Sequence, residues 1–311
     1  NCIIFVSISN YSTIESSTCS SSSEKRVSPD SSGTSAGSSH GGRGSGVCYG
    51  SFRHPSESGS GGGSWNGAGK AFGGGVISID VKGTTTVEGG VTANGERKDW
   101  YGPSGGSVYL STRFLAGNGT ISANGGNLVN GGLGGGGRVA VYLTDAGATF
   151  DDFAGLIAAY GGRSDATSSG VGSSGTVFLS LASDPEDGGT LVLDNGDIAK
   201  YGSNAYGSGA DFPLVDERDH RQNANLKVVI GKYGYVVSRG PITVKELEMS
   251  DSTGKLNLNG QPLSILSTAH RSRKKPKDAL GHWQGDWPGT VSYDTAGSTI
   301  LWGAGFLLFV R

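Results

Sequence analysis

Few residues of this 311-residue chain stand in patterns that do chemistry. The segment 33–37 (GTSAG) matches the GxSxG pattern of serine hydrolases, whose serine needs a strand before it and a helix after it. Here it lies in Ser-rich sequence, so we interpret it as coincidence. Gly132, Gly134 and Gly137 match the phosphate-binding GxGxxG pattern, but a strand-like segment follows where a helix is required. Neither match predicts an active site.

Metal ligands are equally sparse. Carboxylates gather in predicted turns at 151–152 and 184–187, but Ca²⁺ takes about six or more oxygens, and no EF-hand or GGxGxD repeat supplies them. The histidines are scattered through polar segments: His40, His54, His220, His270 and His282. We therefore predict no metal, no cofactor and no catalytic residues.

Aromatic side chains in loops suggest a binding role. Trp65, Trp100 and Tyr101 are candidates for stacking on sugar rings, and the alternative is that they pack down as lids on a thin core. Asn118 and Asn10 begin the sequons NGT and NYS, so both are candidate N-glycosylation sites.

The cysteines leave two interpretations open. Cys2, Cys19 and Cys48 all lie in the first fifth of the chain, without a CxxC pair. An oxidising compartment would allow one disulfide and one free thiol, and the alternative is three unpaired thiols.

Composition limits the class of protein. The chain contains 57 Gly, and hydrophobic residues make up 35% of it, which favours a thin core and argues against a helical bundle. Charged residues are 17% and the net charge is −2, so no nucleic-acid partner is expected. The apolar runs at 2–9 and 300–311 are too short to span a membrane.

An internal repeat organises the Gly-rich part. Four segments share one strand pattern, and a second series follows them at similar intervals of about 30 to 38 residues. The first series is marked by Val76, Val108, Val139 and Val177, and the second by Val91, Ile121, Ile157 and Val192. Alternating apolar residues indicate strands, and equal spacing indicates that each strand pairs in parallel with its counterpart.

These observations predict an all-β fold, a right-handed parallel β-helix with Gly-rich loops on one edge and a Ser-rich N-terminal segment. The loops at 95–106, 125–137 and 161–175 would stack as extended polyglycine or, alternatively, be disordered. Asn94, Asn124 and Asn195 would form a hydrogen-bonded ladder at one corner.

Four regions follow from this prediction. Residues 1–40 form a Ser-rich leader or linker, 41–200 the Gly-rich β-helix, 201–225 a polar insertion, and 226–311 further β-solenoid strands. A chain that begins at Asn1 and ends directly after an apolar strand is expected to be a segment of a longer protein.

The segments GTISANGG, GGGGRVAVY, SGTVFL, TLVLDNGD and ILWGAGFLLFVR resemble the Gly-rich repeat regions of large secreted and cell-surface proteins of bacteria and protists. The resemblance covers about residues 41–311 and implies an adhesin-like, extracellular β-helix. It brings no catalytic motif.

We therefore predict a non-enzymatic extracellular or cell-surface structural protein, an adhesin, matrix or fibre subunit that associates with itself head to tail. One alternative is a glycan-binding module. Another is a polysaccharide lyase or hydrolase, but that needs a carboxylate pair on one face, and the acidic residues concentrate in turns.

Overall fold

The computed structural model describes residues 7–9, 38–44, 46–62, 71–97, 101–128, 132–165, 170–201, 207–212, 223–271, 285–292 and 300–302. These residues form strands joined by turns and extended segments. Within the described ranges the helical residues are all 3₁₀, in η1 (Phe150–Asp152) and in a turn at 199–201, and there is no α-helix. Apolar side chains alternate between buried and half-buried positions along the strands, as the period of two predicts.

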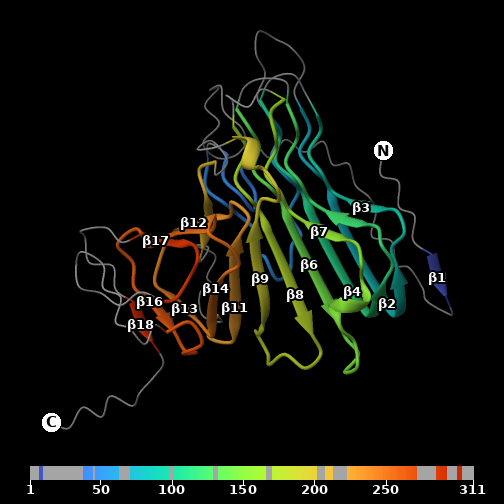
Figure 1. Cartoon of the computed structure of the whole chain (residues 1–311). Helices are drawn as coiled ribbons and strands as arrows, with labels where there is room; N and C mark the ends of the chain where they lie inside the picture. Colours follow the sequence, from blue (N-terminus) through green and yellow to red (C-terminus); the bar gives the residue numbers. More distant parts are fainter. Residues whose placement is uncertain are drawn as a thin grey trace.

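Eight strands lie side by side in the largest sheet, which crosses Figure 1 from β1 on the right to β14 on the left. In sheet order they are β1 (Ser7–Ser9), β2 (Val76–Thr86), β4 (Ser107–Ala116), β6 (Arg138–Leu143), β8 (Thr176–Leu181), β9 (Gly189–Asp194), β11 (Leu226–Gly231) and β14 (Glu246–Met249). Strands β2, β4, β6 and β8 are parallel to one another, and so are β9, β11 and β14. The pairs β1–β2 and β8–β9 are antiparallel, so the sheet is mixed.

Three smaller sheets are parallel throughout. The first consists of β3 (Gly90–Thr92), β5 (Thr120–Ser122) and β7 (Leu156–Ala158). The second consists of β10 (Ala210–Phe212), β12 (Tyr235–Ser238), β15 (Lys255–Asn257) and β17 (Thr290–Ser292). The third consists of β13 (Ile242–Val244), β16 (Leu263–Ile265) and β18 (Ile300–Trp302).

The register of the first repeat series is confirmed for three of its four members. Val108 pairs with Val139, and Val139 pairs with Val177. The residue of β2 in this row is Ile77, while Val76 pairs with Ser107. The repeat therefore identified the parallel strands and placed one of them out of register by one residue.

The predicted right-handed parallel β-helix is wrong. The described residues form four separate sheets, and the chain reverses direction between β8 and β9. Val192, expected to follow Ile157 in the second series, lies instead in the largest sheet and pairs antiparallel with Val177.

A tight turn accounts for this reversal. The Asp184 carboxylate accepts a hydrogen bond from the Leu181 amide at 2.8 Å, and Gly188 N–H donates to the Pro185 carbonyl at 2.8 Å. Gly189 has a φ of +113°, which is available to glycine and strained for other residues. The segment SDPEDGG is therefore a hairpin turn, and it ends the parallel series.

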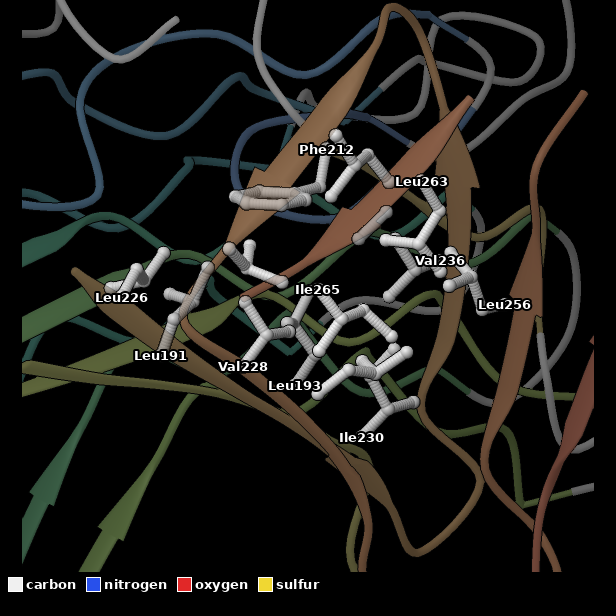
Figure 2. Close-up of a cluster of buried hydrophobic side chains, with 14 of the residues drawn as sticks. Leu191, Leu193, Phe212, Leu226, Val228, Ile230, Val236, Leu256, Leu263 and Ile265 are labelled. Atoms are coloured by element: carbon white, nitrogen blue, oxygen red, sulfur yellow. The ribbon is translucent and has the colours of Figure 1, made fainter. Parts of the chain in front are cut away.

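The hairpin also moves the hydrophobic core to the opposite face of the largest sheet. Val177 and Val192, which pair with each other, face one side, and their neighbours Phe178 and Leu191 face the other. The first core lies on the former side and includes Ile77, Ile79, Val81, Val108, Leu110, Ile121, Val139 and Val141. The second core, part of which is drawn in Figure 2, includes Leu191, Leu193, Phe212, Leu226, Val228, Ile230, Val236, Leu256, Leu263 and Ile265.

Glycine-rich segments pack together beside the first core. We call residues 41–42, 102–106, 132–137 and 172–175 the glycine layer. They are joined by backbone hydrogen bonds, for example Gly105 N–H to the Gly135 carbonyl at 3.1 Å and Gly136 N–H to the Ser173 carbonyl at 2.9 Å. A Cβ on Gly136 would lie 2.0 Å from the Ala159 carbonyl oxygen, which no side chain permits. The described parts of these segments are extended and stack on one another through backbone hydrogen bonds, as one of the two alternatives predicted.

The N-terminal segment 38–62 belongs to this structure. Ser38 N–H donates to the Gly102 carbonyl at 3.1 Å, and the Ser38 carbonyl accepts from Gly135 N–H at 2.8 Å. Phe52 is 1% exposed and packs edge-on against Phe178, with ring centroids 5.5 Å apart. The segment therefore pairs with the glycine layer and packs into the second core.

Candidate binding groove

At strand β7 the first core has a margin that no further strand of the described residues covers. This strand is the last of the sheet β3-β5-β7 and pairs on one side with β5. Leu156 N–H bonds to the Gly119 carbonyl and the Ala158 carbonyl accepts from Ala123 N–H, both on the β5 side. Strand alternation then directs the N–H and C=O of Ile157 to the opposite edge, where no strand of the described residues pairs with β7.

A pocket of about 90 Å³ lies beside this edge. It is lined by Ile157, Ala158, Ala159, Tyr160, Gly175, Val177, Leu179, Val192 and Asp194. Ile157, Leu179 and Val192 are half-buried at the margin of the first core. Leu191 and Leu193 of β9 point to the opposite face, into the second core, so they do not cover these three side chains. We call this pocket together with the free edge of β7 the groove.

One end of the groove is polar. Burial raises the pKa of Asp194, although Gly196 N–H donates to its carboxylate at 3.0 Å and Lys232 is nearby. Burial also raises the pKa of Tyr160, and the negative charge of Asp194 adds to the effect. The Arg163 guanidinium lies over the Tyr160 ring, 5.4 Å from its centroid. The groove therefore combines an aliphatic floor with one half-buried carboxyl group.

The same face of the sheet continues beyond the pocket as a charged surface. Thr190 of β9 pairs with Lys227, which pairs with Glu246, so these side chains share the face of Val192. Lys227 Nζ lies 2.6 Å from Glu248 Oε2, and this hydrogen bond raises the lysine pKa. His270 Nε2 lies 3.5 Å from Glu246 Oε1.

Glu246, Glu248 and His270 place three donor atoms within 4.8 Å of one another, as a metal site would. The Lys227 ammonium already contacts both carboxylates, at 2.6 Å and 3.9 Å, and supplies the positive charge that they attract. These contacts account for the cluster as an ion-pair network.

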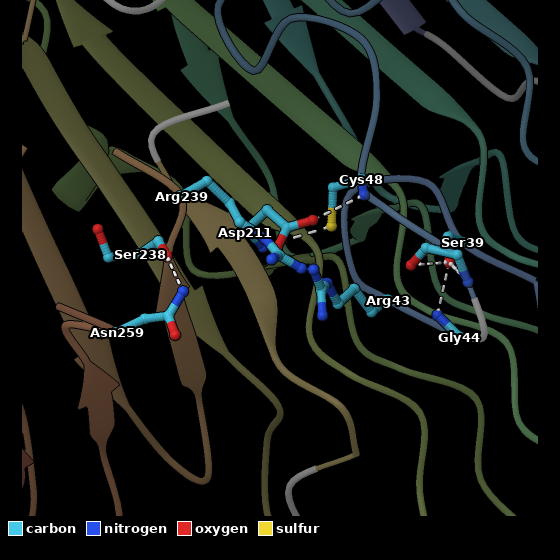
Figure 3. A network of polar contacts seen from close by, with 9 residues as sticks. Ser39, Arg43, Gly44, Cys48, Asp211, Ser238, Arg239 and Asn259 are labelled. Atoms are coloured by element: carbon cyan, nitrogen blue, oxygen red, sulfur yellow. Dashed lines mark hydrogen bonds and ion pairs between the residues drawn. The ribbon is translucent and has the colours of Figure 1, made fainter. Parts of the chain in front are cut away.

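The buried thiol is held in a structural network, shown in Figure 3. Cys48 N–H donates to Asp211 Oδ2 at 2.9 Å, and Asp211 N–H donates to the Cys48 sulfur at 3.4 Å. Arg43 Nε and Arg239 Nε lie 2.8 Å and 2.7 Å from Asp211 Oδ1. Burial, reinforced by the Asp211 charge, raises the pKa of Cys48 to about 12. Because the thiolate is the nucleophilic form, this cysteine is not reactive near neutral pH.

His40 is also buried and held in one protonation state. Its Nδ1 lies 2.8 Å from the Gly105 carbonyl oxygen, so Nδ1 carries the proton and donates. Burial, with a contribution from the nearby Arg138 charge, lowers its pKa to about 3. This neutral imidazole joins residues 38–62 to the glycine layer.

The predicted asparagine ladder is present in a different form. Asn94 Oδ1 accepts from Asn124 N–H at 2.7 Å, and Asn124 Oδ1 accepts from Tyr160 N–H at 2.7 Å. Asn195 Oδ1 accepts from Gly161 N–H at 2.7 Å. In each bond a backbone N–H donates to an asparagine side-chain oxygen, and Gly161, the neighbour of Tyr160, makes the link to Asn195. The series therefore does not need an amide side chain at position 160.

The remaining predicted site residues are not brought together. Tyr101 is 6% exposed and has a φ of +45°, so its ring face is not open to a sugar. Trp65, Trp100 and Asn10 lie outside the described residues, as do Cys2 and Cys19. Asn118 is exposed in the turn between β4 and β5, where a glycan could be attached.

Comparisons with known proteins do not assign the chain to a family: it matches no family model, no curated protein and no solved structure. Within the described ranges, no helix has the length and apolar character needed to cross a lipid bilayer.

The groove residues Ile157, Val192 and Asp194 were not predicted from the sequence as a site. The repeat predicts Ile157 and Val192 as equivalent positions in stacked parallel strands, and not as the two sides of a groove. The available signal was the turn sequence SDPEDGG between β8 and β9, which indicates a hairpin and hence an uncovered strand.

Proposed function

We propose that this chain is a non-enzymatic structural protein of the cell surface or extracellular space, a matrix, adhesin or fibre subunit that associates with itself. The glycine layer is the observation that carries the proposal. Its segments approach so closely that the Cβ of an added side chain would lie 2.0 Å from a backbone oxygen at Gly134, Gly135, Gly136 and Gly175. Such a layer gives a rigid, backbone-bonded slab and contains few groups for chemistry.

The reactive side chains that are described support the same reading. Cys48 is protonated, His40 is neutral, and Asp211 is held by two arginines. Each is buried and makes structural hydrogen bonds or ion pairs. The polar groups that the fold brings together thus stabilise it.

Self-association is proposed through strand edges, because an unpaired edge presents free N–H and C=O groups. The ends of the largest sheet are protected in the usual ways. At one end the Trp287 indole N–H donates to the Leu247 carbonyl of β14 at 3.0 Å. At the other end β1 pairs with Thr84–Thr86 of β2, and the part of β2 before this pairing carries the Asp80–Lys82 ion pair. Among the described residues, the outer strands of the three smaller sheets remain as edges at which copies could pair: β3, β7, β10, β13, β17 and β18.

Sedimentation velocity over a range of concentrations, with electron microscopy of the same samples, tests this proposal. A reductant should be present so that Cys2 and Cys19 cannot cross-link copies, and a chelator so that Glu246, Glu248 and His270 cannot bridge them through a metal. Concentration-dependent oligomers or fibres are expected. A monomer at every concentration would overturn the self-association.

The glycan-binding alternative is not favoured by the described residues. It relied on Trp65, Trp100 and Tyr101, and the one of these that the structure describes is buried. A glycan array tests it directly: binding to a defined sugar would replace the structural proposal with a recognition role.

A further inference from the structure

We propose that the groove is a docking site for an extended segment of a partner protein, which pairs with β7 and places an aliphatic side chain in the pocket and a Lys or Arg two residues later beside Asp194. This goes beyond the structural role proposed above. It assigns the edge of β7 to a partner protein and leaves the other outer strands for self-association, so it does not depend on self-association. Three features carry it: the free edge, the pocket and the carboxyl group.

The free edge determines the backbone geometry of the partner. The N–H and C=O of Ile157 point away from β5 and are spaced to pair with one residue of an added strand. An extended peptide that adds to a sheet edge obtains its affinity from such backbone hydrogen bonds, and its side chains give specificity.

The pocket determines the first side chain. In the existing sheet, Ile121 of β5 pairs with Ile157 and is 0% exposed in the first core. A strand on the other side of β7, in the same register, would place its equivalent side chain over Leu179 and Val192. The 90 Å³ pocket suits a side chain of the size of valine, leucine or isoleucine.

Asp194 determines the second side chain. It lines the pocket, its charge acts on Tyr160, and the next residue, Asn195, accepts a hydrogen bond from Gly161 N–H at 2.7 Å. Asp194 therefore lies toward the segment that follows β7, on the side of Ala159 and Tyr160. Its carboxyl group is half-buried and, among the described residues, receives one hydrogen bond, from Gly196 N–H. A lysine or arginine at the matching position would neutralise this charge where water screens it poorly.

The required sequence, an aliphatic residue followed two positions later by a basic one, also distinguishes a partner protein from a second copy of this chain. None of the eight described outer strands carries a basic residue two positions after an aliphatic one. For example, β3 has Val91 then Ala93, β7 has Ile157 then Ala159, and β13 has Ile242 then Val244. None of these described strands would neutralise Asp194, so we assign the groove to a segment of another protein, and a second copy is an outcome of the hydrogen-exchange test.

A peptide with the sequence of residues 119–125 and the change Ala123→Lys (GTISKNG) is a suitable probe, because β5 already pairs with β7 in this register. Binding to the full chain is measured by calorimetry or fluorescence polarisation. Saturable binding is expected, at least about tenfold tighter than for the matched peptides carrying Ala123→Glu or Ile121→Ser. Equal affinities for the three peptides, or no saturation at about 1 mM, would overturn the proposal.

Protein variants locate the effect. Asp194→Asn retains an acceptor for Gly196 N–H and should abolish the preference for lysine over glutamate in the peptide. Asp165→Asn, at an exposed ion pair elsewhere, should leave the preference unchanged. A lysine preference that survives Asp194→Asn would overturn the assigned role of Asp194.

Hydrogen exchange tests the strand geometry. The Ile157 amide should gain protection when the peptide binds, and binding without this protection would overturn strand addition. Protection of Ile157 that rises with protein concentration alone would show a second copy in the groove and overturn the assignment to a partner protein, whatever the outcome of the sedimentation experiment.

Discussion

At the scale of single residues, the buried polar groups couple stability to pH and to charge. His40 donates from Nδ1 to the Gly105 carbonyl and is neutral inside the fold, whereas the unfolded chain exposes an ordinary imidazole. Asp211 is 4% exposed and pairs with two arginines that are 18% and 30% exposed. Each arrangement predicts a measurable effect of a single substitution.

The His40 prediction concerns acid stability. Between about pH 6.5 and pH 3 the unfolded chain binds a proton that the folded chain does not, so stability falls as pH falls, by up to about 1.4 kcal/mol per pH unit. His40→Asn preserves a donor for the Gly105 carbonyl and should flatten this dependence. Denaturant unfolding of both proteins across the window measures the difference, with the exposed His54→Asn as the control. Parallel pH profiles for the wild type and His40→Asn would contradict the buried, neutral imidazole.

The Asp211 prediction concerns a buried charge. Asp211→Asn leaves Arg43 and Arg239 beside a neutral group and should lower the free energy of unfolding by about 3 kcal/mol. Asp165→Asn is the matched control, since its partner Arg97 is 63% exposed, and the loss should stay below about 1 kcal/mol. Equal losses in the two variants would show that burial does not strengthen the Asp211 network.

At the scale of elements, the glycine layer is the most constrained part of the fold. A Cβ on Gly136 would meet the Ala159 oxygen at 2.0 Å and the Gly175 nitrogen at 2.4 Å, and both are backbone atoms that cannot rotate away. Gly136→Ala should therefore lower the free energy of unfolding by about 3 kcal/mol or more. Gly147 lies in an open turn, where the nearest atom is 3.6 Å away, and Gly147→Ala should change it by less than about 0.5 kcal/mol. Thermal unfolding of the Gly136→Ala and Gly147→Ala variants measures the difference. Similar melting temperatures would show that the backbone of the glycine layer can move apart to accommodate a methyl group.

The strands and the glycine layer were largely predictable from the sequence, and the path of the chain after β8 was not. Alternation located β2, β4, β6 and β8, and equal spacing put Val108, Val139 and Val177 in one row. Spacing alone does not distinguish a strand that continues in parallel from one that returns through a hairpin. The turn at 182–188 makes the chain return antiparallel to β8. The hairpin is stabilised by Phe178 and Leu191, which pair with each other and belong to the second core on the opposite face of the sheet.

The groove was unpredictable for the same reason. It exists because β9 covers the edge of β8 while no described strand covers the edge of β7. Ile157 and Asp194 lie 37 positions apart in the sequence (194 − 157), and nothing in either segment marks them as neighbours. The recurring Asn-Gly pairs predicted where the asparagine ladder lies. They did not predict that its hydrogen bonds come from backbone amides, because this depends on how the neighbouring segments are placed in the fold.

At the scale of the whole molecule, two cores share one sheet and should unfold together. Leu110 is 1% exposed in the first core and Leu247 is 2% exposed in the second. Truncating either to alanine should cost about 2 to 5 kcal/mol and shift a single transition, because the strands of both cores are hydrogen-bonded in the same sheet. Hydrogen exchange of β4 amides in Leu247→Ala measures this coupling. Two separate transitions, or β4 exchange unchanged by Leu247→Ala, would show that the halves behave as independent units.

The glycine layer also affects how readily the chain can be cut by proteases. Proteases bind an extended segment through hydrogen bonds to its backbone amides and through a pocket for a bulky or charged side chain. Residues 102–106, 132–137 and 172–175 contain no lysine, arginine or aromatic residue, Leu133 is the one large aliphatic side chain among them, and many of their amides are already bonded to one another. Trypsin and chymotrypsin therefore have no preferred side chain in these segments, and few backbone amides are free to pair with the protease. We expect both enzymes to cut accessible turns elsewhere and to leave the glycine layer intact.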